Sequence, residues 1–473
     1  MIRRTLMRRA YNSGNYSTAR RHAQKLVHLP SEQQLARSVI IRSYWNQQQY
    51  EEIVQLLQQW KDSELMPYLQ KSIDQLLVLK AKGEEVSISL RGFQSKRHAL
   101  LQKNQPIPVI EREWNKEKII ENFFQENQRI WFRFPQNYCY WDMPEDFNIE
   151  QVHPSLLGLV AELLLSPWHK EAKLQIQSPR EKGSHPGLSF SAGTDSTAAY
   201  LVLPDDTILG YHERSFESQL KHDNAKKLIN HLINVHDRKV FSIPSNHEII
   251  RTYHDQSIGF STDLACASHL ILLADHLDLG GIAFGMPVDN SWLWKGRVFR
   301  NFENTPYFQY WRKRFSHAGL DLILPIAGIS EAGAIKICQQ SELLPYLNSC
   351  MRKNGNGGCG ECWKCFHKNG PLGRPFNFNA KEIQVFLNRK IIPTAMHALW
   401  AIDIMGLKNQ APLSIQELLE NDFSWWDKVY PPSKEIIPSQ WREHVWERIC
   451  TYLEMMDAPY PLEMVNLYNE RLE

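Results

Sequence analysis

The spacing of hydrophobic positions changes twice along the 473-residue chain. Up to about residue 85, apolar residues recur at helical spacing, and amphipathic helices are expected at 17–26 and 51–60. From residue 173, short apolar runs alternate with longer amphipathic stretches, which is typical of a parallel sheet flanked by helices. After about residue 375, helical spacing returns. The pattern therefore predicts an α/β fold, with a parallel-sheet core between two helical regions.

The elements of the core follow from the same pattern. We expect strands at 188–191, 207–211, 239–243 and 281–285, and helices at 197–202, 216–234 and 262–277. Beyond the core, a long tryptophan-bearing helix is expected at 435–456.

Residues 86–172 are expected to form a linker and an aromatic mixed segment. The stretch 82–108 is polar, and helices are predicted at 111–125 and 154–165. Two aromatic runs, 130–134 and 138–141, flank a short polar turn and predict a pair of strands. The predicted domains are therefore 1–85, 86–172, 173–375 and 376–473.

The first 85 residues contain a repeat. Tyr16 and Tyr50 stand in similar contexts 34 residues apart, and each precedes one of the two expected helices. The period resembles that of tetratricopeptide-type hairpins, in which an aromatic residue at the turn packs on the next helix and a small residue such as Ala19 allows close approach. This resemblance implies a module that binds a partner protein. An ordinary helical cap on the next domain would produce the same pattern.

Composition and charge exclude some classes of protein. Hydrophobic residues make up 43% and charged residues 22%, which excludes general disorder. The formal net charge of +2 does not indicate a nucleic-acid binder. Residues 1–30, however, carry seven basic residues and no acid, which suits either a tRNA-binding arm or a solvated helix face.

No targeting or membrane segment is expected. The N-terminus lacks the apolar core of a signal peptide, although its arginines faintly resemble a mitochondrial transit peptide. The sequence contains no apolar run of about 18 residues. A cytoplasmic protein without membrane contact is therefore expected.

A candidate phosphate loop lies between the first core strand and the helix after it. It reads F-S-A-G-T-D-S-T from Phe190 to Thr197. A strand-to-helix turn of this kind exposes backbone N–H groups at a helix N-terminus, where the helix dipole attracts phosphate. Asp195 would repel phosphate unless Mg²⁺ lies between them. The spacing matches neither a Walker A loop nor a dinucleotide-binding loop, and an ordinary capped turn is the alternative.

The hexapeptide S-A-G-T-D-S at 191–196 resembles the S-G-G-x-D-S loop of the N-type ATP pyrophosphatases, the PP-loop family. Ala192 replaces the first glycine, which the loop tolerates if the φ angle of this residue stays negative. The resemblance implies that ATP places its pyrophosphate in this loop. The nucleotide contacts that it implies are Ser189, Ser191, Ala192, Gly193, Thr194, Asp195, Ser196, Thr197 and Tyr211.

Four of the eight cysteines, Cys350, Cys359, Cys362 and Cys365, fall within sixteen residues. A disulfide scaffold would be small and rich in cysteine throughout, so a metal site in a reducing compartment is the better interpretation. Four thiolates suit tetrahedral Zn²⁺. An iron–sulfur cluster and plain buried or redox thiols are the alternatives. His367 is expected beside these ligands or at the surface.

Together the two motifs resemble one branch of the PP-loop family, the 7-cyano-7-deazaguanine synthases of the queuosine pathway. That branch carries a C-x8-C-G-x-C-x-x-C zinc site near the end of its PP-loop domain. Tyr211 to Arg214 resembles its Y-G-Q-R stretch with two departures, and Gly285 to Asp289 resembles its G-x-x-x-x-D loop, one residue shorter. The resemblance spans about 185–370, under half of the chain.

The resemblance implies an ATP-dependent C–N ligase that uses Mg²⁺ and Zn²⁺. A substrate carboxylate attacks the α-phosphate, and ammonia or an amine then displaces AMP to give an amide, which the synthases convert to a nitrile. Asp195 would help to hold the metal, with Ser196 at the phosphates. Arg214 would neutralise a phosphate or carboxylate, or form only a surface salt bridge. Asp289 would contact substrate or metal, or cap a loop.

Other functions are compatible with the same residues. A related enzyme would amidate a sugar acid, or attach a deazaguanine-like base to a protein or glycan. Modification of tRNA is a further alternative, although a nucleic-acid partner is not favoured. Lys295, Arg297 and Arg300 would bind an anionic substrate or form a solvated face. A helical-repeat adaptor with a nucleotide-sensing domain would not be an enzyme, and the intact Gly193 and Asp195 count against it.

Overall fold

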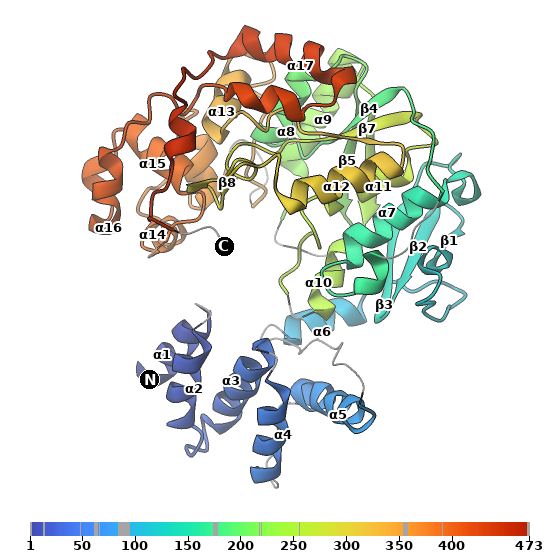
Figure 1. Cartoon of the computed structure of the whole chain (residues 1–473), viewed down its shortest axis with the longest axis vertical. Helices are drawn as coiled ribbons and strands as arrows, with labels where there is room; N and C mark the ends of the chain where they lie inside the picture. The colour runs from blue at the N-terminus through green and yellow to red at the C-terminus, as the bar shows by residue number, and fades with distance from the viewer. Residues whose placement is uncertain are drawn as a thin grey trace. The chain divides into compact units, whose positions relative to one another are not determined.

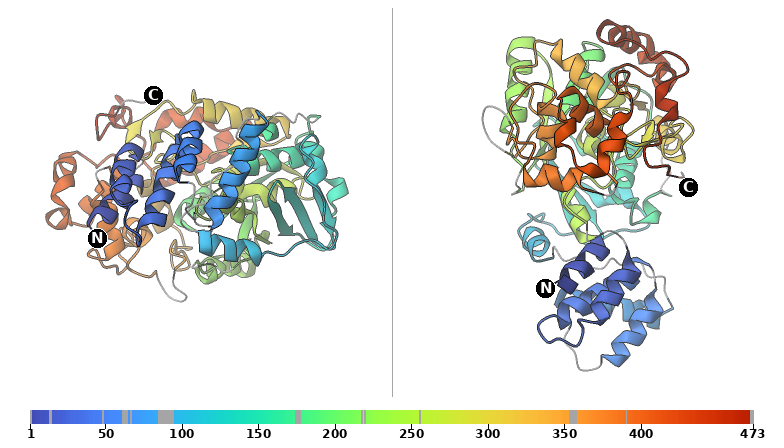
Figure 2. Two further views of the ribbon diagram at one scale, coloured as in Figure 1. Left: turned by 90° about the horizontal axis from the view of Figure 1, so that it is seen from below. Right: turned by 90° about the vertical axis from the view of Figure 1, so that its left-hand side faces the viewer.

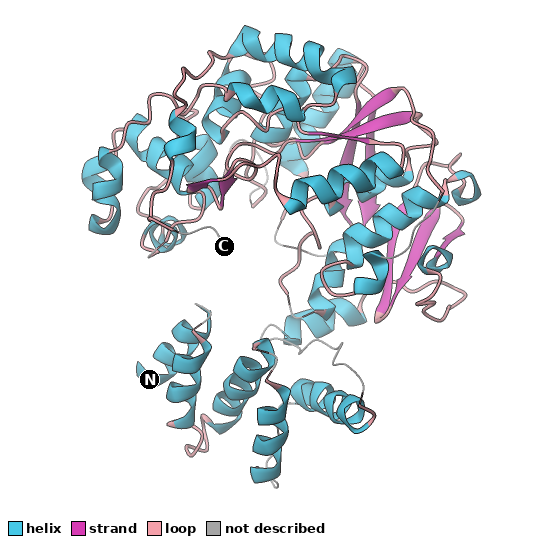
Figure 3. Ribbon diagram, in the orientation of Figure 1, coloured by secondary structure: helices cyan, strands magenta, loops and turns pink. Residues whose placement is uncertain are grey.

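A computed structural model describes residues 2–12, 15–47, 49–60, 65, 67–83, 95–173, 178–216, 218, 220–254, 256–352, 358–389 and 391–470. The chain divides into two compact units. The first comprises Met1–Ile107, Pro167–His169 and Glu248–Ser261, and the second comprises Pro108–Ser166, Lys170–His247 and Thr262–Glu473. Figures 1 and 3 show their helices and strands.

The first unit is helical. Its elements are α1 (Ile2–Asn12), α2 (Tyr16–Gln24), α3 (Gln33–Asn46), α4 (Tyr50–Gln59), α5 (Pro67–Ala81), α6 (Ser95–Lys103) and α10 (Ile250–Tyr253). The helices expected at 17–26 and 51–60 are confirmed as α2 and α4. The linker expected at 82–108 contains α6, and its residues 84–94 lie outside the described part of the chain.

The 34-residue period has a structural counterpart in the first unit. Tyr11 meets Tyr16 edge to face, with ring centroids 5.6 Å apart. In the next repeat Trp45 meets Tyr50 in the same way at 5.5 Å. The hairpins α1–α2 and α3–α4, dark blue in Figure 2, are therefore packed by equivalent aromatic pairs.

The second unit is organised around an eight-stranded sheet, drawn in magenta in Figure 3. The strand order is β1-β2-β3-β6-β5-β4-β7-β10. The strands are β1 (Phe123–Glu126), β2 (Arg129–Phe134), β3 (Asn137–Asp142), β4 (His185–Ser189), β5 (Ile208–Arg214), β6 (Val240–Ser245), β7 (Leu279–Phe284) and β10 (Asp321–Ile323). From β6 to β10 all neighbours are parallel, whereas β1, β2 and β3 pair antiparallel. The predicted α/β class with a parallel core is confirmed.

The aromatic strands are part of the same sheet as the core. Trp141 of β3 pairs antiparallel with Ser245 of β6. The segments before and after residue 173, predicted as separate domains, therefore share one sheet. A similar result holds for residues 376–473, whose helices lie in the same compact unit: α14 (Lys381–Leu387), α15 (Ala395–Ile404), α16 (Leu413–Gln416) and α17 (Ser439–Tyr452).

Helices cover both faces of the sheet. One hydrophobic core joins strand residues such as Leu209 to α8 (Thr194–Val202), α9 (Asp223–His236), α13 (Glu331–Gln339) and α17. The next residue, Gly210, faces the opposite way, because a Cβ there would lie 2.4 Å from Leu270. Leu270 belongs to α11 (Ser268–Leu272), which packs with α7 (Pro154–Leu165) and, through it, with α12 (Pro306–His317).

Two helix predictions in the second unit are wrong. Residues 111–125 do not form an α-helix: Ile119–Asn122 is a single 3₁₀ turn, and the Asn122 side chain accepts a bond from Asn115 N and donates one to Asn115 O, both at 2.8 Å. These bonds replace a helical ladder, and the chain continues as β1. Residues 262–277 do not form one helix, since a 3₁₀ turn (Ala265–Ala267) precedes the five-residue α11 and turns follow it.

Two others begin later than expected. The helix predicted at 216–234 is α9, which begins at Asp223, after Lys221 N has paired with Met351 O at 2.6 Å. The helix predicted at 435–456 is α17, which begins after Pro438 and ends at Tyr452. No described helix is long and apolar enough to cross a membrane.

Candidate functional site

The candidate phosphate loop lies between a strand and a helix, as its sequence predicts. β4 ends at Ser189, and α8 begins at Thr194 with Gly193 at its N-cap. Ser191 Oγ lies 3.0 Å from Ser196 Oγ, and Ser196 Oγ donates to Gly193 O over 3.1 Å. The two hydroxyl groups therefore brace the turn at the N-terminus of α8.

Ala192 has an unusual backbone conformation. Its φ angle is +55°, and the residue is 1% exposed. The condition stated for alanine at this position, a negative φ, is therefore not met. The conformation is one that glycine adopts without strain, which is the residue that the PP-loop motif has here.

The loop lies where the direction of the sheet reverses. The chain moves outward from β4 to β5 and β6 and returns to β7 on the other side of β4. In open α/β sheets, ligands bind outside the carboxyl ends of the strands at such a switch point. The loop after β7 closes on the phosphate loop, because a Cβ on Gly285 would lie 2.8 Å from the backbone of Ser196.

The other residues predicted to contact the nucleotide are mostly buried or hydrogen-bonded within the protein. Thr194 donates its N–H to Ser349 Oγ over 3.0 Å, and its hydroxyl lies 2.8 Å from the same atom. Thr197 is fully buried. The Tyr211 hydroxyl bonds to His222 Nδ1, and Ser189 Oγ donates to Cys266 Sγ over 3.4 Å. Except for the Thr197 hydroxyl, which has no hydrogen-bond partner among the described residues, these side chains bond within the protein. Ser191, Gly193, Asp195 and Ser196 line the turn.

The predicted basic residues also have partners within the chain. Arg214 donates to Ser218 Oγ over 3.1 Å. Arg297 forms a bidentate ion pair with Glu470, and Arg300 donates to two backbone carbonyl groups. Lys295 lies over the Trp294 ring at 4.2 Å. The structure does not gather these residues into an anion-binding surface.

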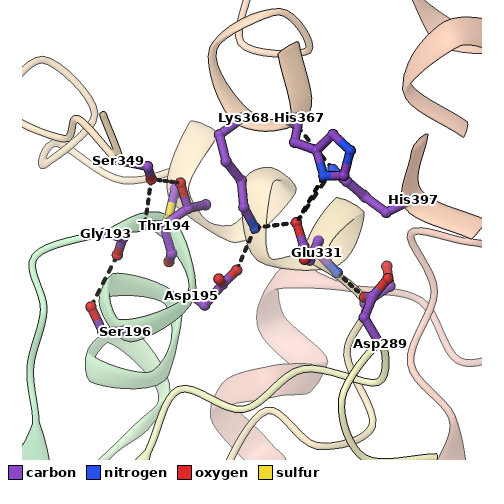
Figure 4. A network of polar contacts seen from close by, with 12 residues as sticks. Gly193, Thr194, Asp195, Ser196, Asp289, Glu331, Ser349, His367, Lys368 and His397 are labelled. Carbon is purple, nitrogen blue, oxygen red and sulfur yellow. Dashed lines mark hydrogen bonds and ion pairs between the residues drawn. The ribbon is translucent and has the colours of Figure 1, made fainter. Parts of the chain in front are cut away.

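Asp195 instead joins a buried polar network, which Figure 4 shows from close by. Lys368 Nζ donates to Asp195 Oδ1 over 2.6 Å and lies 2.8 Å from Glu331 Oε2. The backbone N–H of Glu331, at the first turn of α13, donates to Asp289 Oδ2 over 3.0 Å. The side chain of Asp195 is 29% exposed, whereas Lys368, Glu331 and Asp289 are buried. Asp289 therefore caps a helix.

Burial and charge set the ionisation of this network. Burial raises the pKa of Asp195, and Lys368 opposes this effect. Burial also disfavours the charged form of Lys368, yet Asp195 and Glu331 raise its pKa. Burial acts on Glu331 too, but Lys368 and His397 hold the pKa of Glu331 well below its usual range. The network therefore holds an ammonium group between two carboxylates, one of which belongs to the phosphate loop.

The four cysteines form a metal-type cluster. The Sγ–Sγ distances are 3.8 Å for Cys350–Cys362, 3.8 Å for Cys359–Cys365 and 3.6 Å for Cys362–Cys365. Tetrahedral bonds of about 2.3 Å to Zn²⁺ imply an Sγ–Sγ distance of about 3.8 Å. The backbone N–H of Gly360 donates to Cys365 Sγ, and that of Cys359 donates to Cys350 Sγ, both over 3.3 Å. These four thiols can hold a metal such as zinc.

One turn of helix joins the cysteine cluster to the polar network. The turn Cys365–Asn369 carries the metal-type ligand Cys365, the buried His367 and Lys368. Ser349, which precedes Cys350, bonds to Thr194 at the start of α8. The cysteine cluster and the candidate phosphate loop are therefore linked through residues close to two of the cysteines.

Comparison with known proteins adds one match. A family model described as "Family of unknown function (DUF6395)" matches residues 310–370. The matched segment contains the four cysteines, Glu331 and Lys368, but not the phosphate loop. No curated protein and no solved structure matches the chain.

Sequence reasoning missed Lys368, Glu331 and Ser349 as members of the site. Ser349 and Lys368 flank the cysteine motif, and that proximity was the available signal. Glu331 gives no such signal, because 136 positions separate it from Asp195 and only the packing of α13 on α8 brings them together.

Proposed function

We propose that the chain is an ATP-dependent adenylating enzyme of the PP-loop type. It would activate a substrate carboxylate or carbonyl with release of pyrophosphate, for transfer to a nitrogen nucleophile. The observation that carries this proposal is the pairing of Asp195 with Lys368 beside a strand-to-helix phosphate loop, at the switch point of the sheet.

The residues around the loop suit a triphosphate. The N-terminus of α8 favours negative charge, and the Ser191 and Ser196 hydroxyl groups lie beside it. Lys368 brings a buried positive charge to the same place. Mg²⁺, when bound through Asp195, would neutralise charge on the pyrophosphate. We infer that Lys368 leaves Asp195 for a phosphate oxygen when the nucleotide binds.

The proposed reaction has two steps. A carboxylate oxygen of the substrate attacks the α-phosphorus of ATP, the bond to the bridging β-phosphate oxygen breaks, and pyrophosphate leaves. Ammonia or an amine then attacks the acyl carbon, loses a proton and displaces AMP. Lys368 would balance the charge on the departing pyrophosphate, a type of contribution that is typically worth about 10²–10³ in kcat.

The cysteine motif supports a narrower proposal for the reaction. The spacing of its cysteines resembles that of the 7-cyano-7-deazaguanine synthases, which supports formation of an amide, with a nitrile as a further product. A carboxylate on a sugar acid, a protein or a tRNA is the alternative. The stacked hairpins of the first unit favour a macromolecular acceptor, since helical repeats present extended binding surfaces.

The experiment is ATP binding and pyrophosphate release by the full-length chain with Mg²⁺ and a panel of carboxylates. Asp195→Asn and Lys368→Met should each lower pyrophosphate release at least about 100-fold, because each removes a charge at the loop. Lys336→Met is the matched control, since Lys336 pairs with Asp427 at 3.1 Å elsewhere on α13. A wild-type chain that binds no ATP, or an Asp195→Asn chain with wild-type turnover, would overturn the proposal.

A further inference from the structure

A second group of metal-type ligands lies beside the Asp195–Lys368 pair. Glu331 of α13, His367 of the turn Cys365–Asn369 and His397 of α15 each bring one ligand atom to within 4.8 Å of the others. Glu331 Oε2 is 3.8 Å from His367 Nδ1 and 3.6 Å from His397 Nε2. Figure 4 shows the two histidines meeting at the Glu331 carboxylate.

These separations suit one divalent ion. With bonds of about 2.0–2.1 Å, tetrahedral nitrogen and oxygen ligands lie about 3.4 Å apart. The two distances to Glu331 exceed this value by only a few tenths of an ångström, which a small rotation of each side chain removes. Two imidazoles and one carboxylate are also ligands that Zn²⁺ accepts.

Burial supports a metal independently of these distances. His367 and His397 are fully buried. Neither ring nitrogen of His367, nor Nδ1 of His397, has a hydrogen-bond partner among the described residues. A buried polar atom without a partner destabilises the folded state. An ion bound to Nδ1 of His367 would give one of these atoms a partner.

The hydrogen bonding of His397 is compatible with an ion. His397 Nε2 now lies 2.9 Å from His367 O. To bind an ion through Nε2, the His397 ring would release this bond, turn away from His367 O and carry its proton on Nδ1.

The charges of the polar network are a third reason to expect a bound ion. One ammonium group, that of Lys368, serves both Asp195 and Glu331, and Asp289 adds a further buried carboxyl group beside them. Buried charges are costly unless they are paired. An ion on Glu331 would compensate that carboxylate and leave Lys368 to Asp195.

We propose that Glu331, His367 and His397 form a second site for a divalent ion of the zinc type, distinct from the four-cysteine cluster. Its test does not depend on ATP or on turnover.

The test counts metal ions on the folded, full-length chain. Protein incubated with excess Zn²⁺ and then desalted should carry two ions per chain. Glu331→Gln keeps the size of the side chain, and His397→Gln keeps its polarity. Each variant should carry one ion per chain, because each loses a metal ligand. His269→Gln is the matched control, since His269 is equally buried but lies outside the cluster; it should carry two. A wild-type count of one, or a count of two in Glu331→Gln, overturns the proposal.

Cobalt keeps the proposal testable if the variants fail to fold. On the wild-type chain, the first Co²⁺ should give thiolate-to-cobalt charge-transfer bands from the cysteines. The second should add d–d bands without further charge-transfer absorption, because its ligands are nitrogen and oxygen. Added charge-transfer intensity with the second ion would place it on sulfur and overturn the proposal.

Discussion

Ala192 holds a left-handed backbone conformation at the centre of the phosphate loop. Its φ angle is +55°, and its methyl group is buried. An L-residue in this region costs about 1–2 kcal/mol relative to glycine. Strain of this kind persists where the surrounding structure requires it, commonly at functional sites. Here the requirement is the close bracing of Ser191 and Ser196.

Replacing Ala192 by glycine should therefore not destabilise the protein. Relief of strain offsets the loss of a buried methyl group, worth about 0.8 kcal/mol, so the free energy of unfolding of Ala192→Gly should be unchanged or about 1 kcal/mol higher. Ala199→Gly, in the buried helical part of α8, should lower it by about 2 kcal/mol. Urea unfolding measures both values. Equal losses in the two variants would contradict this account.

At the scale of elements, the turn Cys365–Asn369 couples a metal-type ligand to a charged residue of the site. Asn369 Nδ2 donates to Cys365 Sγ over 3.6 Å, and Gly370 N donates to Cys365 O over 2.8 Å. Lys368 is fixed between these two positions. Its approach to Asp195 thus depends on how firmly the cysteines hold the turn.

Removal of the cysteine-bound metal should release this turn. After treatment with a chelator, we expect faster amide hydrogen exchange at 365–370 and a loss of pyrophosphate release of at least about 10-fold, because second-layer supports of a site are commonly worth that much. Re-addition of Zn²⁺ should restore both. Exchange that stays unchanged while the metal is removed would show that packing alone holds the turn.

A second link between elements joins α7 and α12. Glu162 of α7 is fully buried and pairs with Arg314 of α12 at 2.6 Å. Burial raises the pKa of Glu162 to about 7, although Arg314 opposes the shift. In the unfolded chain a glutamate titrates near pH 4.3. Between these values the folded state binds more protons, so stability is fully present below about pH 4 and falls as pH rises toward 7.

Glu162→Gln should remove this pH dependence. Between about pH 4.5 and 7, the wild-type free energy of unfolding should lose on the order of 1–3 kcal/mol through this group. The slope should be smaller in Glu162→Gln, whatever the loss of the ion pair does to its overall stability. Glu150→Gln, at an exposed position, is the control and should keep the wild-type slope. Denaturant unfolding at several pH values tests this, and an unchanged slope in Glu162→Gln would contradict it.

At the scale of the whole chain, one side chain ties the aromatic strands to the parallel core. Trp141 of β3 is fully buried, donates to Ser268 Oγ over 3.1 Å and stacks on His247. β3 pairs with β6 at only one position. The buried Trp141 side chain therefore supplies important contacts between the antiparallel strands and the parallel core.

Trp141→Leu should destabilise the second unit as a whole. We expect the free energy of unfolding to fall by about 2–4 kcal/mol, since a large buried side chain leaves a cavity. Trp425→Leu, at a partly exposed position, should cost less than about 1.5 kcal/mol. Circular dichroism and tryptophan fluorescence should report one shared transition, and two separate transitions in the wild-type unit would contradict a single cooperative sheet.

The local sequence pattern was sufficient to predict helices and strands whose main contacts are with residues nearby in the sequence. The buried helix at 154–165 was predicted to the residue, and the aromatic strands were placed to within one residue. The strand expected at 188–191 and the helix expected at 197–202 are β4 and α8, and each begins three residues earlier than expected. Periodicity failed at 111–125, where Asn115 and Asn122 satisfy backbone groups through their side chains. It also failed at 262–277, where residues 267–274 are all buried and show no amphipathic face to define one helix.

The sequence by itself determined the α/β class, the phosphate-type loop and the cysteine cluster, because each depends on residues that are close together along the chain. Only the tertiary structure decided that the aromatic hairpin extends the core sheet and that Asp195, Glu331, Lys368 and His397 meet. Those residues come from four separate elements, and no local spacing records the packing of α13 and α15 that brings them together. Local chemistry is therefore readable from sequence, whereas the buried charge network is a product of long-range packing.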